Sequence, residues 1–397
     1  MKCPHGGRRA GIVLALSALT LFSACGGGPA RTAARTTTST PAVTHEPPGP
    51  EATTTAGARP HRTKRHHAAA ARHRVHQPKH RAKPRHKARL AVHHQALCPL
   101  TGTPAPGGKV PKRAALAVKV ENLPEARPQY GIGQADIVFE EPVEGGITRF
   151  IAVFQCHTSA RIEPVRSARL VDPQILEPMG RLLFAYSGAT QYVVNEVDAP
   201  GTLLEDVGGY DAGNAYWRDP YREEPHNLET STAVLYAAAA ALHYRERLPT
   251  PIFSYGHEVR GGTAAAAVNI YFPLDVTTWT WDRKTGTYYR SYSDTGPATL
   301  GGGGQITASN VIVMLVHEYA TKYTEDINGA HENELTLKGS GPAWLFRDGV
   351  QFYGKWVRPL LDHPTVFYEK NGTKIKLTPG STWVELVPDG DRISVKP

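Results

Sequence analysis

The residues of this sequence that are best suited to chemistry are five of the arginines between positions 149 and 222. Arginine presents a planar fork of donors that can hold a carboxylate or a phosphate through two parallel hydrogen bonds. Two of them, Arg166 and Arg169, stand three positions apart, so they would share one face of a helical turn but point to opposite sides of an extended chain. We therefore predict a site for an anion or a partner protein that comprises Glu144, Arg149, Arg166, Ser167, Arg169, Arg218, Asp219, Arg222, His226 and Asn227.

The same arginines could instead be neutralised inside the fold. Several acidic residues are close to them in the sequence, and an arginine that pairs with a buried carboxylate has a structural role. Both interpretations stay open on the sequence alone. The acidic residues in question are Asp136, Glu140, Glu141, Glu144 and Asp219.

Catalysis is the third interpretation of this region. His226 could act as a general base that Glu144 or Asp219 orients, with Ser167 or water as the nucleophile. The sequence has no Gly-x-Ser-x-Gly turn and no His-Glu-x-x-His pair, which favours a non-catalytic protein. His317 and His331 are each followed by a glutamate, but their spacing is not that of a metal site. We therefore predict no metal ion and no cofactor.

The elements that must position these residues begin in the first half of the folded region, residues 98–250. Asp172 precedes a proline and is the expected N-cap of one helix, while Thr230 and Ser231 supply cap chemistry for a second, alanine-rich helix. Short apolar runs between Pro- and Gly-rich turns predict strands. The expected strands are Ala114–Val120, Ile137–Glu140 and Phe150–Phe154, and the expected helices are Pro173–Met179 and Ser231–Arg247.

Residues 251–397 follow a different pattern. Short β-branched or aromatic runs alternate with turn pairs such as Asp348-Gly349 and Asn371-Gly372. The predicted fold class is therefore α+β, with a mixed α/β N-terminal domain (98–250) followed by a mainly antiparallel β C-terminal domain (251–397). The predicted strands are Ile270–Phe272, Thr278–Asp282, Thr287–Ser291, Val311–Val316, Glu334–Leu337, Ala343–Arg347, Val350–Lys355, Val366–Glu369, Thr373–Leu377 and Trp383–Val387.

The basic charge of the chain belongs to the segment that precedes the fold. The whole chain carries a formal charge of +9, yet residues 26–97 alone hold 14 lysines and arginines against two glutamates. That segment has almost no large apolar residues, so we predict a disordered linker rich in His, Arg and Pro. The remaining folded region is acidic, which argues against binding to nucleic acid.

Residues 1–25 have the pattern of an export signal. A basic head precedes an apolar run from Gly11 to Phe22, which is too short to span a bilayer. The ending Phe22-Ser23-Ala24-Cys25 resembles a bacterial lipobox, which implies cleavage before Cys25 and lipidation of that residue. Export leads to an oxidising compartment, where Cys98 and Cys156 could pair, and two unlinked buried thiols are the alternative.

Longer phrases of the folded region resemble those of a known bacterial family. They are Ala126–Gly131, Val143–Phe150, Pro164–Arg169, Trp217–Arg222 and Pro225–Leu228. These phrases are similar to those of the YerB-like lipoproteins, which combine an N-terminal domain of unknown function with a separate C-terminal domain. The resemblance covers essentially the whole folded region and implies an envelope lipoprotein with two domains, but it implies no settled activity.

Two functional hypotheses follow from these observations. In the first, the chain is a membrane-anchored lipoprotein on the extracytoplasmic face, held by lipid on Cys25. It would bind an anionic wall polymer, peptidoglycan or a wall-synthesis protein without catalysis. In the second, it is a hydrolase or transferase that acts on the cell wall through His226 and a carboxylate.

Replacing Cys25 with alanine tests the predicted anchor. We expect the Cys25→Ala protein to lose metabolic fatty-acid labelling and to be released from the membrane or stalled in processing, because the lipid is attached through that thiol. Labelling that survives the substitution would show that Cys25 is not the lipidated residue.

Overall fold

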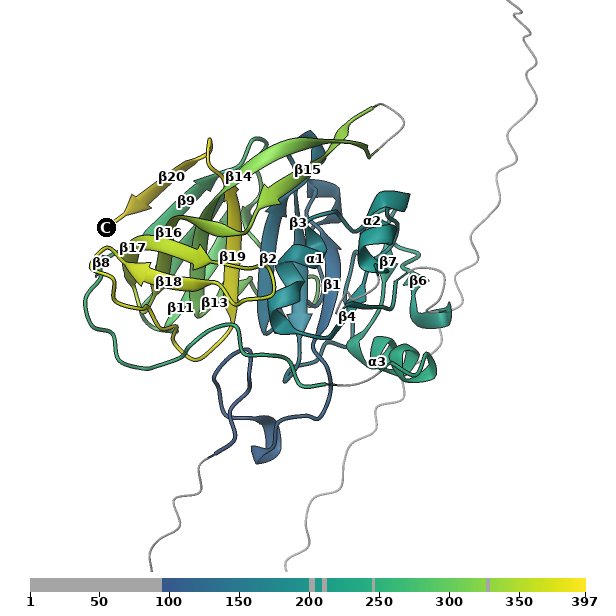
Figure 1. Cartoon of the computed structure of the whole chain (residues 1–397), viewed down its shortest axis with the longest axis horizontal. Coiled ribbons are helices and arrows are strands. Elements are labelled where there is room, and N and C mark those ends of the chain that lie inside the picture. The colour runs from purple at the N-terminus through teal and green to yellow at the C-terminus, as the bar shows by residue number, and fades with distance from the viewer. Residues whose placement is uncertain (1–94, 200–203, 209–212, 245–246, 326–328) are drawn as a thin grey trace, which may run out of the picture. The chain divides into compact units, whose positions relative to one another are not determined.

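The computed structural model describes residues 95–199, 204–208, 213–244, 247–325 and 329–397. The predicted signal with Cys25 and nearly all of the predicted linker lie outside these residues. The first half of the described chain forms three α-helices and seven strands, with short 3₁₀ turns between them (Figure 1). They are β1 (Leu116–Glu121), β2 (Ile137–Pro142), β3 (Thr148–Phe154), α1 (Asp172–Leu176), β4 (Leu182–Ala185), α2 (Gln191–Val197), β5 (Leu204–Asp206), β6 (Trp217–Arg218), β7 (Leu228–Glu229) and α3 (Thr232–Ala241).

The second half contains strands, as the alternating pattern predicted. The Asp348-Gly349 pair joins two of them in a tight hairpin, with positive φ at both residues. The strands are β8 (Thr263–Ala264), β9 (Ala267–Tyr271), β10 (Val276–Asp282), β11 (Thr287–Tyr292), β12 (Gly296–Pro297), β13 (Thr307–Ala308), β14 (Asn310–Thr324), β15 (His331–Thr336), β16 (Gly339–Arg347), β17 (Val350–Arg358), β18 (Val366–Glu369), β19 (Thr382–Pro388) and β20 (Arg392–Lys396).

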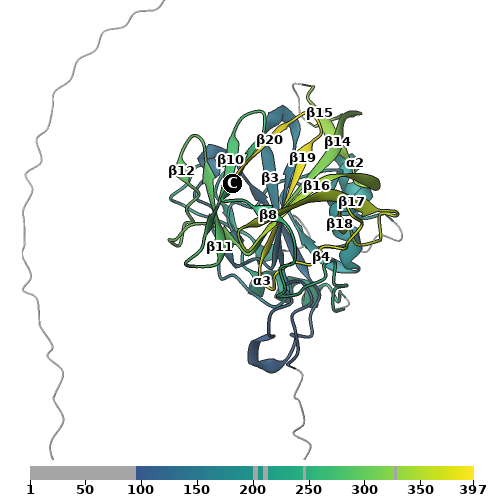
Figure 2. The same ribbon diagram turned by 90° about the vertical axis from the view of Figure 1, so that its left-hand side faces the viewer.

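One large mixed sheet contains strands from both halves of the chain. Its order is β18-β17-β16-β14-β19-β2-β3-β1-β4-β5, and β19 pairs in parallel with both β14 and β2. A second sheet of antiparallel pairs has the order β12-β11-β10-β9-β20 (Figure 2). The protein is therefore rich in strands with few helices, and its sheet is continuous across the boundary between residues 250 and 251.

The two faces of the large sheet carry the two main hydrophobic cores. One face packs against the second sheet and α3, through residues such as Trp279 and Leu235. The other face packs against α1 and α2, through residues such as Leu176 and Val193. Each core contains residues from both halves of the chain. Among the described helices, none combines the length and the apolar character that crossing a bilayer requires.

Three local expectations were wrong. Asp172 does not cap α1, because its carboxylate accepts the backbone N–H of Arg169 and pairs with Lys119, and the N-cap position is Val171. The helix capped by Ser231 ends at Ala241, well before the predicted end. Thr373–Leu377 forms an isolated bridge to β18 at Lys374 but no strand.

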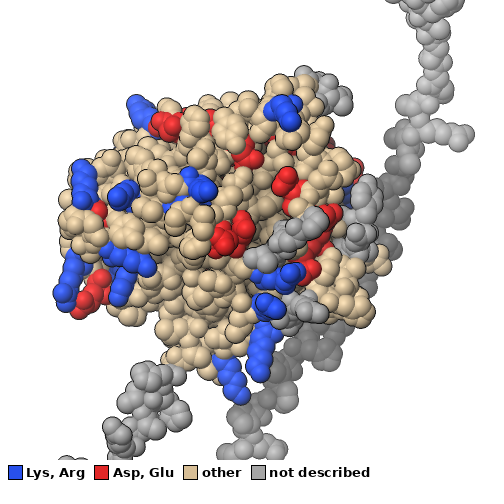
Figure 3. Space-filling view, viewed as in Figure 1, with Lys and Arg blue, Asp and Glu red and all other residues tan. Residues whose placement is uncertain are grey.

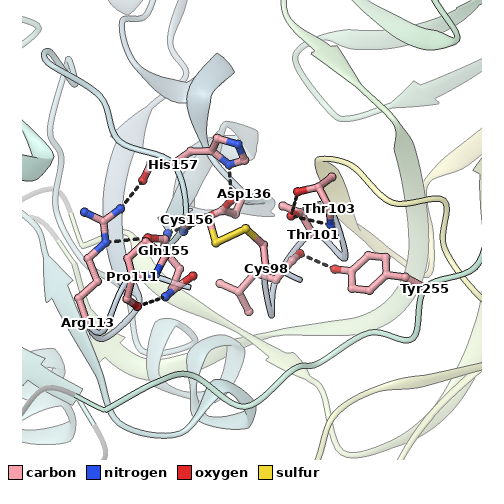
Figure 4. The surroundings of a disulfide bond; sticks show 11 residues. Cys98, Thr101, Thr103, Pro111, Arg113, Asp136, Gln155, Cys156, His157 and Tyr255 are labelled. Carbon is pink, nitrogen blue, oxygen red and sulfur yellow. Dashed lines mark hydrogen bonds and ion pairs between the residues drawn. A yellow bond between two sulfur atoms is a disulfide. The ribbon is translucent and has the colours of Figure 1, made fainter. Parts of the chain in front are cut away.

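The segment before β1 is fixed to the end of β3 by a disulfide between Cys98 and Cys156 (Figure 4). The two Cα atoms are 6.0 Å apart. Asp136 lies beside the bridge, where its carboxylate accepts the backbone N–H of Cys156 at 3.0 Å and contacts His157 Nδ1 at 2.6 Å. Hydrogen bonding to Asp136 raises the pKa of His157. Of the two cysteine states that the sequence left open, the structure contains the disulfide.

Arg290 of β11 is completely buried between the two sheets. Its Nη2 contacts Glu140 of β2 at 2.6 Å, and its Nη1 contacts Glu385 of β19 at 3.0 Å. Aromatic rings surround the guanidinium, with centroids 5.0–5.5 Å from its central carbon. Burial and the charge of Glu140 raise the pKa of Glu385 well above its usual range. With Glu385 protonated, the three groups together carry no net charge.

Removing this guanidinium should strongly destabilise the protein. The Arg290→Met variant strands the buried Glu140 carboxylate, and we expect a loss of about 3–5 kcal/mol in the free energy of unfolding by urea. The double variant Arg290→Met/Glu140→Gln should recover part of this loss, because it removes the unpaired charge. A single variant as stable as the wild type would contradict this account.

Candidate functional site

The predicted site residues fall into two charged groups joined by a short chain of contacts. The inner cluster lies where β2 turns into β3, beside the segment that precedes α1. The outer cluster surrounds β6 and β7. The inner cluster comprises Lys119, Glu141, Glu144, Arg149, Arg169, Asp172 and Glu325, and the outer cluster comprises Arg161, Glu163, Arg218, Asp219, Arg222, Asn227 and Glu229.

Glu144 holds two of the predicted arginines. It lies in the 3₁₀ turn Glu144–Gly146 between β2 and β3, where Gly145 has a positive φ. Its carboxylate accepts Nε of Arg169 at 2.7 Å and contacts Nη2 of Arg149 at 3.2 Å. Although burial opposes ionisation, these two guanidinium groups lower the pKa of Glu144 to about 2. Both arginines are nearly buried, so Glu144 is their internal counter-ion.

Arg169 also joins the N-terminal half to the long β14–β15 hairpin. Its Nη2 contacts Glu325, which follows β14, at 2.6 Å. Burial raises the pKa of Glu325 to about 7, and the negative charge of Glu144 contributes to the same shift. Burial and the charge of Arg169 lower the pKa of Arg149 to about 10. The inner cluster therefore holds charges of both signs that water would otherwise solvate.

Lys119 lies beneath these arginines, in the middle of β1. It is fully buried and its ammonium contacts Glu141 and Asp172, the latter at 2.6 Å. Burial lowers the pKa of Lys119 to about 8, although the neighbouring Asp172 carboxylate acts to raise it. One oxygen of Glu141 has no hydrogen-bond partner among the described residues. Lys119 is therefore the shared counter-ion of two carboxylates at the base of the cluster.

Arg166 and His226 share one carboxylate, that of Glu121 at the end of β1. Arg166 Nε contacts Oε1 at 3.0 Å, and His226 Nδ1 contacts Oε2 at 2.9 Å. Because an ionised carboxylate only accepts, Nδ1 carries the proton and Nε2 is left as the basic nitrogen. The backbone carbonyl of Ser167 accepts Nη1 of Arg149 at 3.1 Å. This chain of contacts connects Arg166 and His226 with the inner cluster.

The outer cluster contains the rest of the predicted residues. Arg161 contacts Glu163 and Asp219, each at 2.6 Å, and lies 3.8 Å from the ring centroid of Tyr130. Arg222 donates to two backbone carbonyls, those of Ala126 at 3.2 Å and Pro128 at 2.5 Å.

Arg218 and Asn227 complete the outer cluster. Arg218 donates to the side chain of Asn227 at 2.8 Å. Asn227 in turn donates to the backbone carbonyls of Asp219 and Arg222, both at 3.1 Å. These contacts fix the segment 217–227, so the outer arginines order a loop.

Three of the five acidic residues expected near the arginines have other partners. Asp136 contacts His157, Glu140 contacts Arg290, and Glu141 contacts Lys119. Sequence reasoning missed Lys119, although a lysine inside an apolar strand was a usable signal. It also missed Glu121, Glu163 and Glu325, for which the local sequence offers no signal.

His317, considered as a metal ligand, is exposed and contacts Asp389 at 3.2 Å. Among the described residues, no group of three His, Cys, Asp or Glu residues could hold a metal ion.

Glu334 of β15 extends the acidic side of the inner cluster. Its Oε1 accepts the side-chain amide of Gln174 at 2.8 Å. Burial raises the pKa of Glu334 to about 7, and the negative charges of Glu332 and Asp172 add to this effect.

A carboxyl whose pKa is higher in the folded state should make stability depend on pH. Between pH 4.5 and 7 Glu334 is protonated in the folded protein but ionised in the unfolded chain. The stability that the protonated carboxyl contributes is therefore complete below pH 4.5 and is lost as pH rises through 7. We expect Glu334→Gln to become more stable than the wild type by about 2 kcal/mol at pH 8 and to differ little at pH 4.5. Urea unfolding at both pH values measures this, and an equal effect at both would contradict the raised pKa.

Comparisons with known proteins agree with this architecture. Models of "Protein of unknown function (DUF3048)" match the chain twice, the N-terminal domain over residues 100–245 and the C-terminal domain over residues 268–384. The "Putative lipoprotein YerB" of Bacillus subtilis (strain 168) is 27% identical over 302 residues, which cover 75% of this chain and 88% of the relative. The crystal structure of the YerB protein from Bacillus subtilis matches with a TM-score of 0.64 and 26% identity, over 75% of this chain and 99% of that one. The chain therefore belongs to the YerB-like lipoprotein family, whose function is unknown, as the sequence resemblance predicted.

Proposed function

We propose that this chain is an extracytoplasmic lipoprotein, held at the membrane by lipid on Cys25, whose folded region binds an anionic component of the cell wall without catalysis. The linker of residues 26–97 would let the folded region reach away from the membrane, since some 70 flexible residues have a root-mean-square span of roughly 45 Å. The membership in a lipoprotein family supports the anchor. The charged site described above supports the binding role.

The observation that carries the binding role concerns Arg166. Its side chain is 24% exposed, and it uses only Nε to contact Glu121. None of the contacts among the described residues involves its two terminal nitrogens, whereas Arg149 and Arg169 are nearly buried against Glu144. A guanidinium with a free and partly exposed fork is suited to bidentate capture of a carboxylate or a phosphate.

The buried arginines support this role from behind. The positive charge of Arg166 contributes to the low pKa of Arg149, so the two groups lie within electrostatic reach of each other. An anion bound to Arg166 would therefore also interact favourably with Arg149. The ion pairs of the inner cluster hold the segment 166–172 in place, which fixes the direction of the Arg166 side chain. In this proposal Arg166 binds the ligand, and Arg149 and Arg169 position it.

A second candidate function rests on His226 and Glu121. Their contact at 2.9 Å is the arrangement of a general base and the carboxylate that orients it. The orienting residue is Glu121 instead of the predicted Glu144 or Asp219. In a wall hydrolase, His226 Nε2 would take a proton from water or from the hydroxyl of Ser167. The binding role is favoured because Glu121 also serves as the counter-ion of Arg166.

Substituting Arg166 tests the binding role. In a chain that carries Cys25→Ala to stay in solution, Arg166→Lys keeps the charge but loses the fork, so co-sedimentation with isolated cell-wall sacculi should weaken about tenfold while the melting temperature stays close to that of the parent. Arg181→Lys is the matched control, because Arg181 has similar exposure and one carboxylate partner, Glu205, outside the site. An equal loss in both variants would reject Arg166 as the binding group.

The variant His226→Gln separates the two candidates in the same assay. A binding protein should keep most of its affinity for sacculi and should release no soluble wall fragments before or after the substitution. A hydrolase should release fragments, and this release should disappear with His226. Fragment release by the parent chain that His226→Gln abolishes would replace the binding role with the enzymatic one.

A further inference from the structure

The outer strands of the large sheet carry a second surface that differs in chemistry from the arginine site. Two cross-strand rows lie on one face of β16, β17 and β18. Trp344 is opposite Tyr353 in the first row, and Lys370 continues that row with its ammonium 4.6 Å from the ring centroid of Tyr353. In the second row Lys355 is opposite Tyr368, which bridges to Lys374. We call these residues the β18 face: Trp344, Tyr353, Lys355, Tyr368, Lys370 and Lys374.

The β18 face is open where the second sheet ends. Phe346, on the same side of β16, is completely buried, and Trp344 is partly buried against the core between the sheets. One strand further out, Tyr353 is 40% exposed. Lys355 and Lys370 are exposed as well. Figure 2 looks onto this end of the molecule, and the left of Figure 3 shows lysine and arginine side chains together with acidic ones at the same end.

The charge on this face is of one sign. Among the residues of β16, β17 and β18 that share it, none is acidic, because alternation places Glu369 on the opposite face together with Gly354. Among the described residues, no carboxylate lies within ion-pair distance of Lys355, Lys370 or Lys374, whereas nearly every arginine of the N-terminal half has one. Three exposed ammonium groups are thus left without an internal counter-ion.

We propose that the β18 face binds a linear polyanion whose repeating unit carries a phosphate or a carboxylate group. Neighbouring strands are about 4.8 Å apart and alternate residues about 7 Å apart, so the three ammonium groups stand at intervals that successive charges of an extended polymer can match. The ring of Tyr353 holds Lys370 in place by a cation–π contact, which lowers the entropy lost when a ligand binds. This surface is independent of Arg166 and would give the protein a second contact with the same anionic envelope.

Paired lysine substitutions test the β18 face. In the chain that carries Cys25→Ala, the variant Lys355→Gln/Lys370→Gln should weaken binding to polyphosphate or to a polyuronate about tenfold at low salt. The control Lys284→Gln/Lys338→Gln removes the same charge from exposed lysines elsewhere, so it should change the affinity less than about twofold. The linker contributes equally in both variants, and neutral dextran should not bind to either.

Three outcomes decide the proposal. If the control pair loses as much affinity as the β18-face pair, net charge alone explains the binding and the proposal is overturned. Binding to dextran would overturn it as well. A loss with polyphosphate alone or with the polyuronate alone would support the face and identify the phosphate or the carboxylate as the group it takes. Because Arg166→Lys leaves these lysines unchanged, polyanion binding that survives Arg166→Lys but falls in the β18-face pair separates this proposal from the arginine site.

Discussion

The guanidinium of Arg290 has to be neutralised inside the protein, because four aromatic rings and two sheets exclude water from it. Its two carboxylate partners come from β2 and β19, which are neighbours in the large sheet. Because the buried guanidinium needs these carboxylates, it links β11 of the second sheet to the β2–β19 pair, where the two halves of the chain meet. Any shift of β19 along β2 would separate Glu385 from Glu140 and leave the guanidinium with one partner.

The position of β2 in turn determines where the arginine site forms. Glu140 is followed by Glu141, which neutralises Lys119, and then by the turn that carries Glu144. Each step along β2 thus places one carboxylate against a different cation. Glu141 and Glu144 belong to the inner cluster, where Glu144 pairs with both Arg149 and Arg169. Arg166 pairs with Glu121 on another strand and uses only its Nε for that contact, so it stands outside this arrangement.

The sequence predicted the strands far better than their partners. Alternation and turn pairs located most strands of the second half, and an arginine-rich region was recognisable from its residue types. The identity of each counter-ion was not predictable, because Arg169 meets Glu325 and Arg290 meets Glu140 only after distant strands have paired in one register. β14 runs beyond the predicted Val311–Val316 to Thr324. Its polar second half is not buried, and hydrogen bonding with β15 keeps it in the strand conformation. Thr373–Leu377 has strand composition, but it forms only isolated bridges, from Lys374 to Tyr368 of β18 and from Leu377 to Tyr255.

The parallel pairing of β19 with β2 also has a consequence for how the chain acquires its structure. Thr382 meets Ile137, a contact between residues 245 positions apart. Until the C-terminal part of the chain arrives, β2 has an open edge of unpaired backbone groups flanked by apolar side chains. Contacts between residues so far apart in the sequence close a long loop, which makes their formation slow. The interval between emergence of β2 and arrival of β19 is therefore the period in which this protein is most exposed to aggregation and to proteolysis.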